Sequence, residues 1–352
     1  MSREFRLGAR VIGAGAPAFV VAEAGVNHNG DAALARRLVI DAAAAGADAV
    51  KFQTFRAADL VTRQAPKAAY QRETTGGDGG QREMLARLEL PPEAFAALRD
   101  ESARHGIVFF SSPFDEASVD VLEALDVALF KIPSGEITNL AFLRHIAAKR
   151  RPIILSTGMS TLDEIAAAVG AIRHAGDPPL ALLQCVSAYP APAEETNLRA
   201  MDTLRDRFGC VVGLSDHTTG IEVAIAAVAR GAAIVEKHFT VDKTLPGPDH
   251  RASLDAAELA ALVRSIRRVE AALGDGDKRP MPSEADTRRV ARKSLVAARP
   301  IERGEKITAQ MIAVKRPGTG IAPADLERAL GRTAARALAA DEVIDWTALE
   351  DA

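Results

Sequence analysis

The residues best suited to chemistry lie where short apolar stretches of the chain end. Eight such stretches begin with apolar residues and finish with polar ones: FVVAEAG (19–25), AVKFQTF (49–55), IVFFSSP (107–113), LFKIPSG (129–135), PIILSTGM (152–159), LALLQCVSAYP (180–190), VVGLSDHT (211–218) and AIVEKHFT (233–240). A Lys, His or Glu inside an apolar β-type stretch is costly to bury unless it has a partner or a task. The pattern therefore predicts a functional site at the ends of strands.

Two lysines and several hydroxyls in these stretches suit an anionic ligand. Lys51 and Lys131 occupy similar positions in the second and fourth stretches, and Ser134, Ser156 and Ser215 lie at comparable depths. Ammonium and hydroxyl groups together can hold a phosphate or carboxylate. The chain has 44 basic and 47 acidic residues, a net charge of -3. An anion must therefore be held by a few placed cations, and no nucleic-acid partner is predicted.

Two histidines end the seventh and eighth stretches. His217 and His238 would lie on neighbouring strands, and two imidazoles leave most coordination positions of a divalent ion open to substrate oxygens. Mn²⁺ fits such a mixed shell best, with Mg²⁺ or Co²⁺ as alternatives and Zn²⁺ compatible with the ligands. Glu23 is a candidate acid or base, or a salt-bridge partner of Lys51. His250 is a further candidate to face the substrate.

The elements that position these residues alternate regularly. Stretches with helical spacing separate the apolar runs, such as 31–47, which starts at Asp31 and stops at Gly46. Nearly continuous apolar runs indicate parallel strands covered on both faces. The chain is therefore predicted to be an α/β protein with a (β/α)₈ TIM barrel over residues 1–273, whose strand ends meet at one rim. An insertion at 56–106, with the sequence TTGGDGGQ at 74–81 and a helix near 82–90, predicts a lid.

A second domain follows the barrel. Residues 274–290 are rich in Gly, Pro and charge and predict a linker, and residues 291–352 predict a small, mostly β domain. Within it, 300–312 and 337–349 show a weak internal repeat. The amino terminus has no signal-like apolar core and no stretch has the length of a membrane span, so a cytoplasmic protein is expected. The two cysteines, Cys185 and Cys210, are interpreted as small buried apolar residues.

Seven ordered sequence blocks resemble the signature blocks of the N-acetylneuraminate (sialic acid) synthase family. They are AEAGVNHNG (22–30), AGADAVKFQTF (45–55), KIPSGEITNL (131–140), LSTGM (155–159), GLSDHT (213–218), EKHFT (236–240) and LPGPDHRASL (245–254). In the second domain, VKRPGTGI (314–321) resembles the central motif of that family's antifreeze-like (SAF) domain. The resemblance spans nearly the whole chain.

This resemblance implies a reaction and a set of roles. Phosphoenolpyruvate would condense with N-acetylmannosamine or a related N-acyl amino sugar, giving N-acetylneuraminate or a related nonulosonic acid and releasing phosphate by C–O cleavage. Glu23 would manage protons or the attacking water, and His217 and His238 would hold the metal that activates the open-chain aldehyde. The expected phosphoenolpyruvate ligands are Lys51, Gln53, Ser112, Lys131, Ser134, Ser156 and Ser215, and the expected sugar contacts are Gln53, Tyr189, Asp249 and Arg316.

The resemblance also implies a domain-swapped homodimer, in which the SAF domain of one subunit caps the barrel of its partner and Arg316 touches the N-acyl group. In the lid, Glu73-Thr74-Thr75 stand where relatives often carry Asn. This departure leaves the sugar open between N-acetylmannosamine and the diacetamido-trideoxy hexoses that legionaminate and pseudaminate synthases use.

Two other functions compete with this interpretation. A Schiff-base aldolase on the same fold would use Lys131 or Lys237 as its nucleophile. A non-catalytic protein would bind ice or glycans through its terminal domain. The paired histidines argue against the aldolase, and the full set of polar side chains at the strand ends argues against a pure binder.

Overall fold

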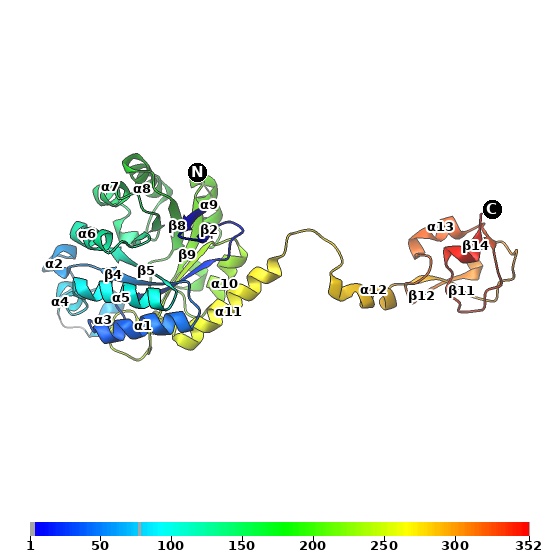
Figure 1. Ribbon diagram of the computed structural model, residues 1–352, viewed down its shortest axis with the longest axis horizontal. Coiled ribbons are helices and arrows are strands. Elements are labelled where there is room, and N and C mark those ends of the chain that lie inside the picture. Colours follow the sequence, from blue (N-terminus) through cyan, green and yellow to red (C-terminus); the bar gives the residue numbers. More distant parts are fainter. Residues whose placement is uncertain (1–3, 77–78, 352) are drawn as a thin grey trace. The chain divides into compact units, whose positions relative to one another are not determined.

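The structure, a computed structural model, describes residues 4–76 and 79–351 (Figure 1). It divides into two compact units, Met1–Gly274 and Asp275–Ala352. The division falls at the start of the predicted linker. No helix within the described ranges is both long and apolar enough to cross a membrane.

Eight parallel strands form the centre of the first unit. Each strand pairs with the next one along the chain from β3 to β5 and from β6 to β10, β10 pairs with β3, and β5 lies beside β6. The order in space is therefore the order in sequence, as in a TIM barrel, and the predicted fold class is confirmed. The strands are β3 (Phe19–Gly25), β4 (Ala49–Thr54), β5 (Val108–Pro113), β6 (Phe130–Ile132), β7 (Ile153–Ser156), β8 (Leu180–Cys185), β9 (Val211–Asp216) and β10 (Ile234–His238).

One helix after each strand covers the outside of the barrel. Side-chain caps fix several starting points: Asp31 accepts from the backbone of α1, and Thr161 with Glu164 forms a capping box at α8. A large apolar cluster fills the space between the helices and the strands. The helices are α1 (Ala32–Ala44), α5 (Pro92–Arg104), α6 (Glu116–Ala124), α7 (Leu140–Ala148), α8 (Leu162–Ala175), α9 (Ala200–Phe208), α10 (Glu222–Ala229) and α11 (Ala256–Leu273).

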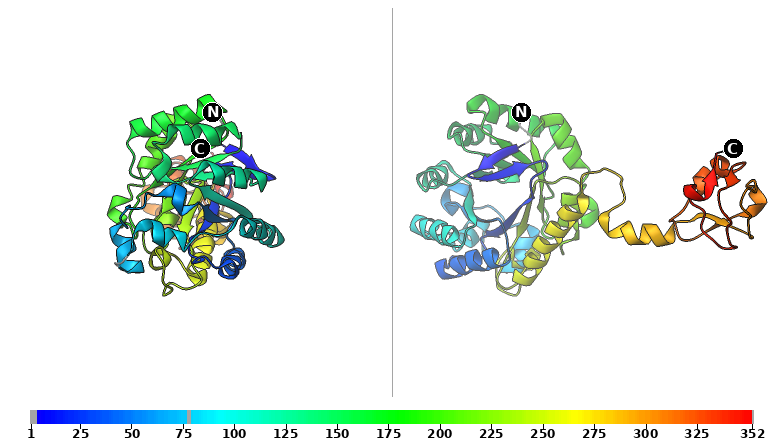
Figure 2. Two further views of the ribbon diagram at one scale, coloured as in Figure 1. Left: turned by 90° about the vertical axis from the view of Figure 1, so that its left-hand side faces the viewer. Right: turned by 45° about the vertical axis from the view of Figure 1, so that its right-hand side comes forward.

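A second apolar cluster fills the barrel interior near the amino-terminal ends of the strands. It contains inward-facing residues such as Phe19, Phe110 and Ile154. An antiparallel hairpin, β1 (Glu4–Leu7) and β2 (Arg10–Gly13), adds Phe5 and Ile12 to the same cluster (dark blue in Figure 2). The sequence analysis did not predict this hairpin. Because apolar packing fills this end, the cavity of the barrel lies at the opposite rim.

The predicted lid consists of three short helices between β4 and α5. These are α2 (Ala57–Leu60), α3 (Ala69–Thr75) and α4 (Gln81–Ala86), and residues 77 and 78 of the insertion lie outside the described residues. A small cluster of Val26, Phe55 and Leu88 attaches the lid to the barrel. Helix α5 belongs to the ring of barrel helices, so the insertion is shorter than the predicted 56–106.

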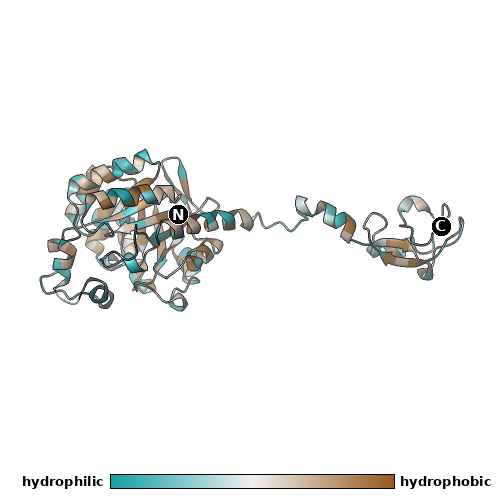
Figure 3. Ribbon diagram, turned by 90° about the horizontal axis from the view of Figure 1, so that it is seen from below, coloured by the Kyte–Doolittle hydropathy of each residue, from teal (hydrophilic) through white to brown (hydrophobic). Residues whose placement is uncertain are grey.

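The second unit is a small domain around its own apolar core. The predicted linker contains the start of helix α12 (Ala285–Ala291), and α13 (Leu326–Ala329) follows later. Two antiparallel pairs form, β11 (Ser294–Ala297) with β12 (Ile312–Lys315) and β13 (Thr333–Ala334) with β14 (Leu349–Glu350). The internal repeat is visible, because a 3₁₀ turn precedes both β12 and β14. Figure 3 shows brown, apolar segments along the strands of this unit and of the barrel.

Candidate active site

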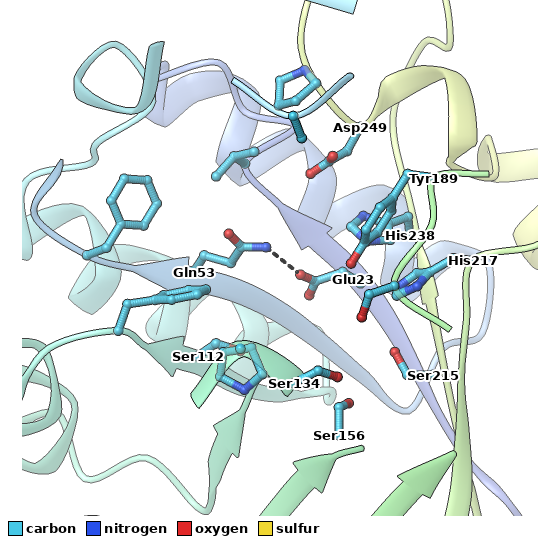
Figure 4. Close-up of a pocket in the computed structure, with 18 of the residues that line it drawn as sticks. Glu23, Gln53, Ser112, Ser134, Ser156, Tyr189, Ser215, His217, His238 and Asp249 are labelled. Atoms are coloured by element: carbon cyan, nitrogen blue, oxygen red, sulfur yellow. Dashed lines mark hydrogen bonds between the residues drawn. The ribbon is translucent and has the colours of Figure 1, made fainter. Parts of the chain in front are cut away.

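A cavity of about 460 Å³ opens at the carboxyl ends of the barrel strands. Every strand of the barrel contributes at least one lining side chain, and the loops after the strands and the lid contribute the rest. Figure 4 shows part of this lining. Arg316 belongs to the second unit, where it is exposed after β12. The cavity brings together all the other predicted site residues: Glu23, Lys51, Gln53, Ser112, Lys131, Ser134, Ser156, Tyr189, Ser215, His217, His238 and Asp249.

The alternation of strand residues explains why these side chains point inward. Phe19 and Val21 belong to the interior cluster, so Glu23 on the same strand faces inward two residues later. The same spacing brings Glu236 and His238 inward after Ile234. The apolar interior therefore sets which residues at the strand ends reach the cavity.

Four buried charged groups form the base of the cavity. The ammonium nitrogen of Lys51 lies 2.8 Å from a carboxylate oxygen of Glu23 and 3.6 Å from one of Glu236. The ammonium nitrogen of Lys131 lies 3.3 Å from the same Glu236 oxygen. All four side chains are buried, and together they are close to electrically neutral when both carboxyls are ionised. The salt bridge that was the alternative role for Glu23 is therefore present.

Hydroxyl groups complete this base. Lys51 donates to Ser112 Oγ at 3.2 Å, Lys131 donates to Ser156 Oγ at 2.8 Å, and Ser215 donates to Glu236 at 3.2 Å. Ser134 Oγ accepts from the backbone N–H of Gly158 at 2.9 Å. A Cβ at Gly158 would lie 2.4 Å from Ser187 Oγ, so the close approach requires glycine there. The ammonium, hydroxyl and amide groups converge as an anion site requires.

Burial and neighbouring charges shift the protonation of this base. Burial raises the pKa of Glu23 to about 7, although the Lys51 ammonium opposes the shift. Burial would also raise the pKa of Glu236, but the charges of Lys131 and Lys51 outweigh it and lower the pKa. Burial lowers the pKa of Lys131. Glu23 can therefore gain or lose a proton near neutral pH, whereas Glu236 remains an anion.

The two predicted metal ligands lie side by side. The rings of His217 and His238 have centroids 5.3 Å apart, and the Tyr189 ring packs on His217 at 4.2 Å. His217 Nδ1 donates to the Val186 carbonyl at 2.7 Å, so Nε2 is the ring nitrogen that could bind an ion. Nδ1 of His238 is buried and has no hydrogen-bond partner among the described residues.

These histidines fit a divalent ion. Burial, together with nearby positive charges, lowers the pKa of His238 well below its usual range, so the ring is neutral as a ligand must be. In residues 4–76 and 79–351 no group of three or more His, Cys, Asp or Glu side chains is arranged to hold a metal. A bound ion would therefore take its other ligands from water or substrate.

The wall of the cavity opposite the base comes from the lid and from loops. Tyr70 on α3 stacks on Tyr189, with ring centroids 5.1 Å apart. Asp249, in the loop after β10, is buried in the same wall, and burial raises its pKa to about 6. We call Glu23, Lys51, Lys131, Ser156, Glu236, His217 and His238 the strand-end half, and Leu60, Tyr70, Gln71, Gln81, Met84 and Leu85 the lid half.

Two predicted candidates do not face the cavity. Lys237 points to the outside of the barrel, where its ammonium binds Asp216 at 2.7 Å, so it cannot be a Schiff-base nucleophile in this cavity. His250 is buried, and its ring nitrogens bond Thr240 and Asn29 at 2.7 and 3.2 Å. The suggestion that His250 faces the substrate is therefore wrong.

Among the cavity residues that received no functional role from the sequence are Glu236, Tyr70 and Cys185. Glu236 was noted only as a polar strand-end residue, and Tyr70 only as part of the insertion. Cys185 was taken as a small apolar residue, yet it lines the cavity with its sulfur 3.9 Å from His217 Nδ1. Strand alternation was the available signal for Cys185, because Ala181 and Leu183 both face the barrel interior.

Comparison with known proteins defines the class of enzyme. The NeuB family model matches residues 38–278 and the SAF domain model matches residues 292–350. N,N'-diacetyllegionaminic acid synthases of Legionella pneumophila and Campylobacter jejuni are each 46% identical, covering 94% and 92% of this chain and 94% and 98% of their own. The crystal structure of an N-acetylneuraminic acid synthetase from Leptospira borgpetersenii superposes with a TM-score of 0.72 at 37% identity, covering 82% of this chain and 95% of that chain.

A TIM barrel with these strand-end residues, followed by a SAF domain, defines a phosphoenolpyruvate-dependent synthase. The chain belongs to the NeuB family.

Proposed function

We propose that this enzyme condenses phosphoenolpyruvate with an open-chain N-acyl amino sugar and water to give a nonulosonic acid and phosphate. Carbon 3 of phosphoenolpyruvate bonds to the aldehyde carbon, and the aldehyde oxygen takes up a proton. Water adds to carbon 2 and loses a proton. The bond from carbon 2 to the phosphate oxygen then breaks and its electron pair leaves with phosphate. The hydroxyl on carbon 2 gives up its proton at the same time, the phosphate or solvent takes that proton, and a ketone remains.

The observation that carries the proposal is the convergence of Lys51 and Lys131 on one buried base with the hydroxyls of Ser112 and Ser156. Phosphoenolpyruvate supplies a phosphate and a carboxylate, which two ammonium groups and several hydroxyls can neutralise. The negative charge of Glu236 between the lysines fixes their positions before the substrate arrives.

His217 and His238 would hold a divalent ion, for which Mn²⁺ is our first choice. When bound, such an ion supplies Lewis-acid polarisation of the sugar aldehyde. Glu23 is placed to move protons, because it lies in this base, accepts from Gln53 at 3.1 Å and has a pKa near neutrality. Tyr189 and Asp249 would line the path of the sugar beyond the histidines.

For the sugar, we favour a diacetamido-trideoxy hexose over N-acetylmannosamine. Both relatives at 46% identity are named as synthases of N,N'-diacetyllegionaminic acid, whereas the N-acetylneuraminic acid synthetase is 37% identical. This departs from N-acetylmannosamine, the first expectation from the sequence.

The decisive test is phosphate release from phosphoenolpyruvate carrying ¹⁸O in the bridging oxygen. We expect release to need both a sugar and Mn²⁺, to stop with EDTA, and to place the ¹⁸O in phosphate, because the C–O bond breaks. Release without a sugar, or ¹⁸O retained in the organic product, would contradict the proposal.

We further propose that the active enzyme is a homodimer in which Arg316 of one subunit completes the site of its partner. Arg316 is exposed and forms no ion pair within residues 4–76 and 79–351, as expected of a cation whose partner lies on another molecule. We expect Arg316→Ala to lower kcat/KM for the sugar by about 10- to 100-fold, the range for a charged hydrogen bond, with little change in KM for phosphoenolpyruvate.

The dimer itself has a separate test. Mixing Arg316→Ala chains, which have a low kcat/KM for the sugar, with His217→Ala chains should raise the activity above that of either variant alone, because one mixed site then contains both native residues. Mixtures that gain no activity although the chains exchange would contradict a shared site, and so would a monomeric active enzyme in sedimentation analysis.

A further inference from the structure

The lid half of the cavity contains a pair of side-chain amides. The amide nitrogen of Gln81 on α4 lies 3.4 Å from the amide oxygen of Gln71 on α3. That oxygen also accepts from the backbone N–H of Ala68 at 2.9 Å, which fixes Gln71 at the start of its helix. The amide oxygen of Gln81 has no hydrogen-bond partner among the described residues, so it and the second N–H of Gln81 are available to a ligand.

A series of contacts leads from the histidines to this pair. The Tyr189 ring packs on His217, the Tyr70 ring packs on Tyr189, and Gln71 donates to the Tyr70 hydroxyl at 3.4 Å. Two aromatic rings therefore separate the amides from the histidines, beside which the aldehyde would lie in the proposed reaction. An acylamino group on the carbon next to the aldehyde would remain beside the histidines, whereas a group farther along the sugar would reach the lid.

Apolar side chains line the lid half together with the amides. Leu60, Met84 and Leu85 line the same part of the cavity, and Phe55 and Phe114 meet edge to face behind them at 6.0 Å. Hydroxyl groups against such a surface would lose hydrogen bonds to water, whereas methyl groups would gain by burial. An acylamino group has one N–H, one carbonyl and a methyl group, which matches two amides in an apolar frame.

We propose that Gln81, held in position by Gln71, binds a second acylamino group of the sugar, on a carbon distant from the aldehyde, and thereby selects diacylamino over monoacylamino sugars. This inference rests on the proposed function and identifies the residues that set its specificity. Gln81 makes the direct contact, and Gln71 positions it.

The lid residues that first raised the question of the sugar have other tasks. Glu73 is exposed and does not line the cavity. Thr74 and Thr75 donate to the backbone carbonyls of Tyr70 and Gln71 at 3.0 and 2.6 Å. The Thr74 and Thr75 hydroxyls therefore bond within α3, and neither residue lines the cavity, so we assign the contact with the sugar to Gln81 instead.

The test compares three sugars in the full-length enzyme with Mn²⁺. These are N-acetylmannosamine, its 6-deoxy form, and 2,4-diacetamido-2,4,6-trideoxymannose, and the readout is kcat/KM from phosphate release. The variant is Gln81→Met, which keeps the side-chain length but lacks the amide. The control is Gln64→Met, since Gln64 is exposed in the same insertion and does not line the cavity.

We expect Gln81→Met to lower kcat/KM for the diacetamido sugar about tenfold, as loss of about one hydrogen bond does. The other two sugars and KM for phosphoenolpyruvate should change less than about twofold, and Gln64→Met should match the wild type. Gln81→Glu is a second variant for the case that Gln81→Met disturbs the lid. It keeps a polar side chain with an acceptor but has no N–H, and we expect the same loss for the diacetamido sugar.

Several results would overturn the inference. Equal losses for all three sugars would show that Gln81 only supports the lid, and unchanged selectivity would show that it does not contact the sugar. A wild-type preference for N-acetylmannosamine would refute the inference while leaving the proposed condensation intact. No phosphate release with any sugar would instead refute the proposed function itself.

Discussion

The two halves of the cavity are built from different kinds of structure. In the strand-end half, side chains come from a hydrogen-bonded barrel, and the buried charges of Lys51, Lys131 and Glu236 hold one another in place. In the lid half, side chains come from helices of four to seven residues and are neutral. Helices this short depend on tertiary contacts for their stability.

From this difference we infer that the strand-end half carries out the reaction and that the lid half selects the sugar. A rigid base with fixed charges suits the step that every sugar undergoes, because preorganised charges need not reorganise during the reaction. A wall of short helices can change its side chains without disturbing the barrel. We therefore expect substitutions in the strand-end half to abolish turnover, and substitutions in the lid half to change the choice of sugar.

The strongest test of this division is His217→Ala. We expect a loss of about a thousandfold in kcat, equivalent to about 4 kcal/mol, because the proposed ion, which would polarise the aldehyde, would lose a ligand. Titration with Mn²⁺, followed by the electron paramagnetic resonance of the free ion, should show weaker binding. His174→Ala is the control, since His174 is exposed on α8. Full activity with Mn²⁺ in His217→Ala would refute the metal assignment.

Lys131→Met tests the anion site in the same half. We expect kcat/KM for phosphoenolpyruvate to fall about a hundredfold, because a buried cation that would pair with the phosphate is lost. The same lysine is the remaining candidate for a Schiff-base aldolase, since burial lowers its pKa. Borohydride with pyruvate should leave the wild-type mass unchanged. A covalent adduct at Lys131 would favour the aldolase.

Asp249 lies between the two halves, and the Asp249→Asn variant tests how burial of its carboxyl changes the free energy of unfolding. The folded-state pKa of Asp249 is raised from 3.8 to about 6 by burial, so folding favours the protonated form. The stability that the protonated Asp249 carboxyl contributes to the folded state is fully present below pH 3.8 and is lost as the pH rises through 6. In the metal-free protein, we expect Asp249→Asn to be more stable than the wild type by about 3 kcal/mol at pH 8, with the gap closing near pH 4.

Denaturant unfolding between pH 4 and pH 8 measures this gap. Asp59→Asn, at an exposed position of α2, should show none. A gap that is the same at every pH would mean that the asparagine stabilises the wall by a route other than charge, and that the Asp249 carboxyl is not destabilised by burial.

The sequence predicted the strand-end half far better than the lid half. A strand has a fixed period of two, so the apolar residues that face the barrel interior also determine the direction of Lys51, Ser156 and His238. Applied to the last strand, the same rule would have excluded Lys237 and given a role to Glu236. It could not have placed Tyr70 or Gln81, because short helices in an insertion have no such register. The β1–β2 hairpin was missed because it is short and lies before the repeating pattern.

The smallest effect is expected at Tyr70, where ring and hydroxyl can be separated. Tyr70→Phe keeps the ring that packs on Tyr189 and loses only the hydroxyl that accepts a long hydrogen bond from Gln71. We expect KM for the sugar to rise less than about threefold, with kcat and KM for phosphoenolpyruvate unchanged. Tyr70→Ala, which also removes the stacked ring, should raise KM for the sugar about tenfold. If Tyr70→Phe instead lowered kcat strongly, the hydroxyl would take part in the chemistry, and the lid half could no longer be assigned to selection alone.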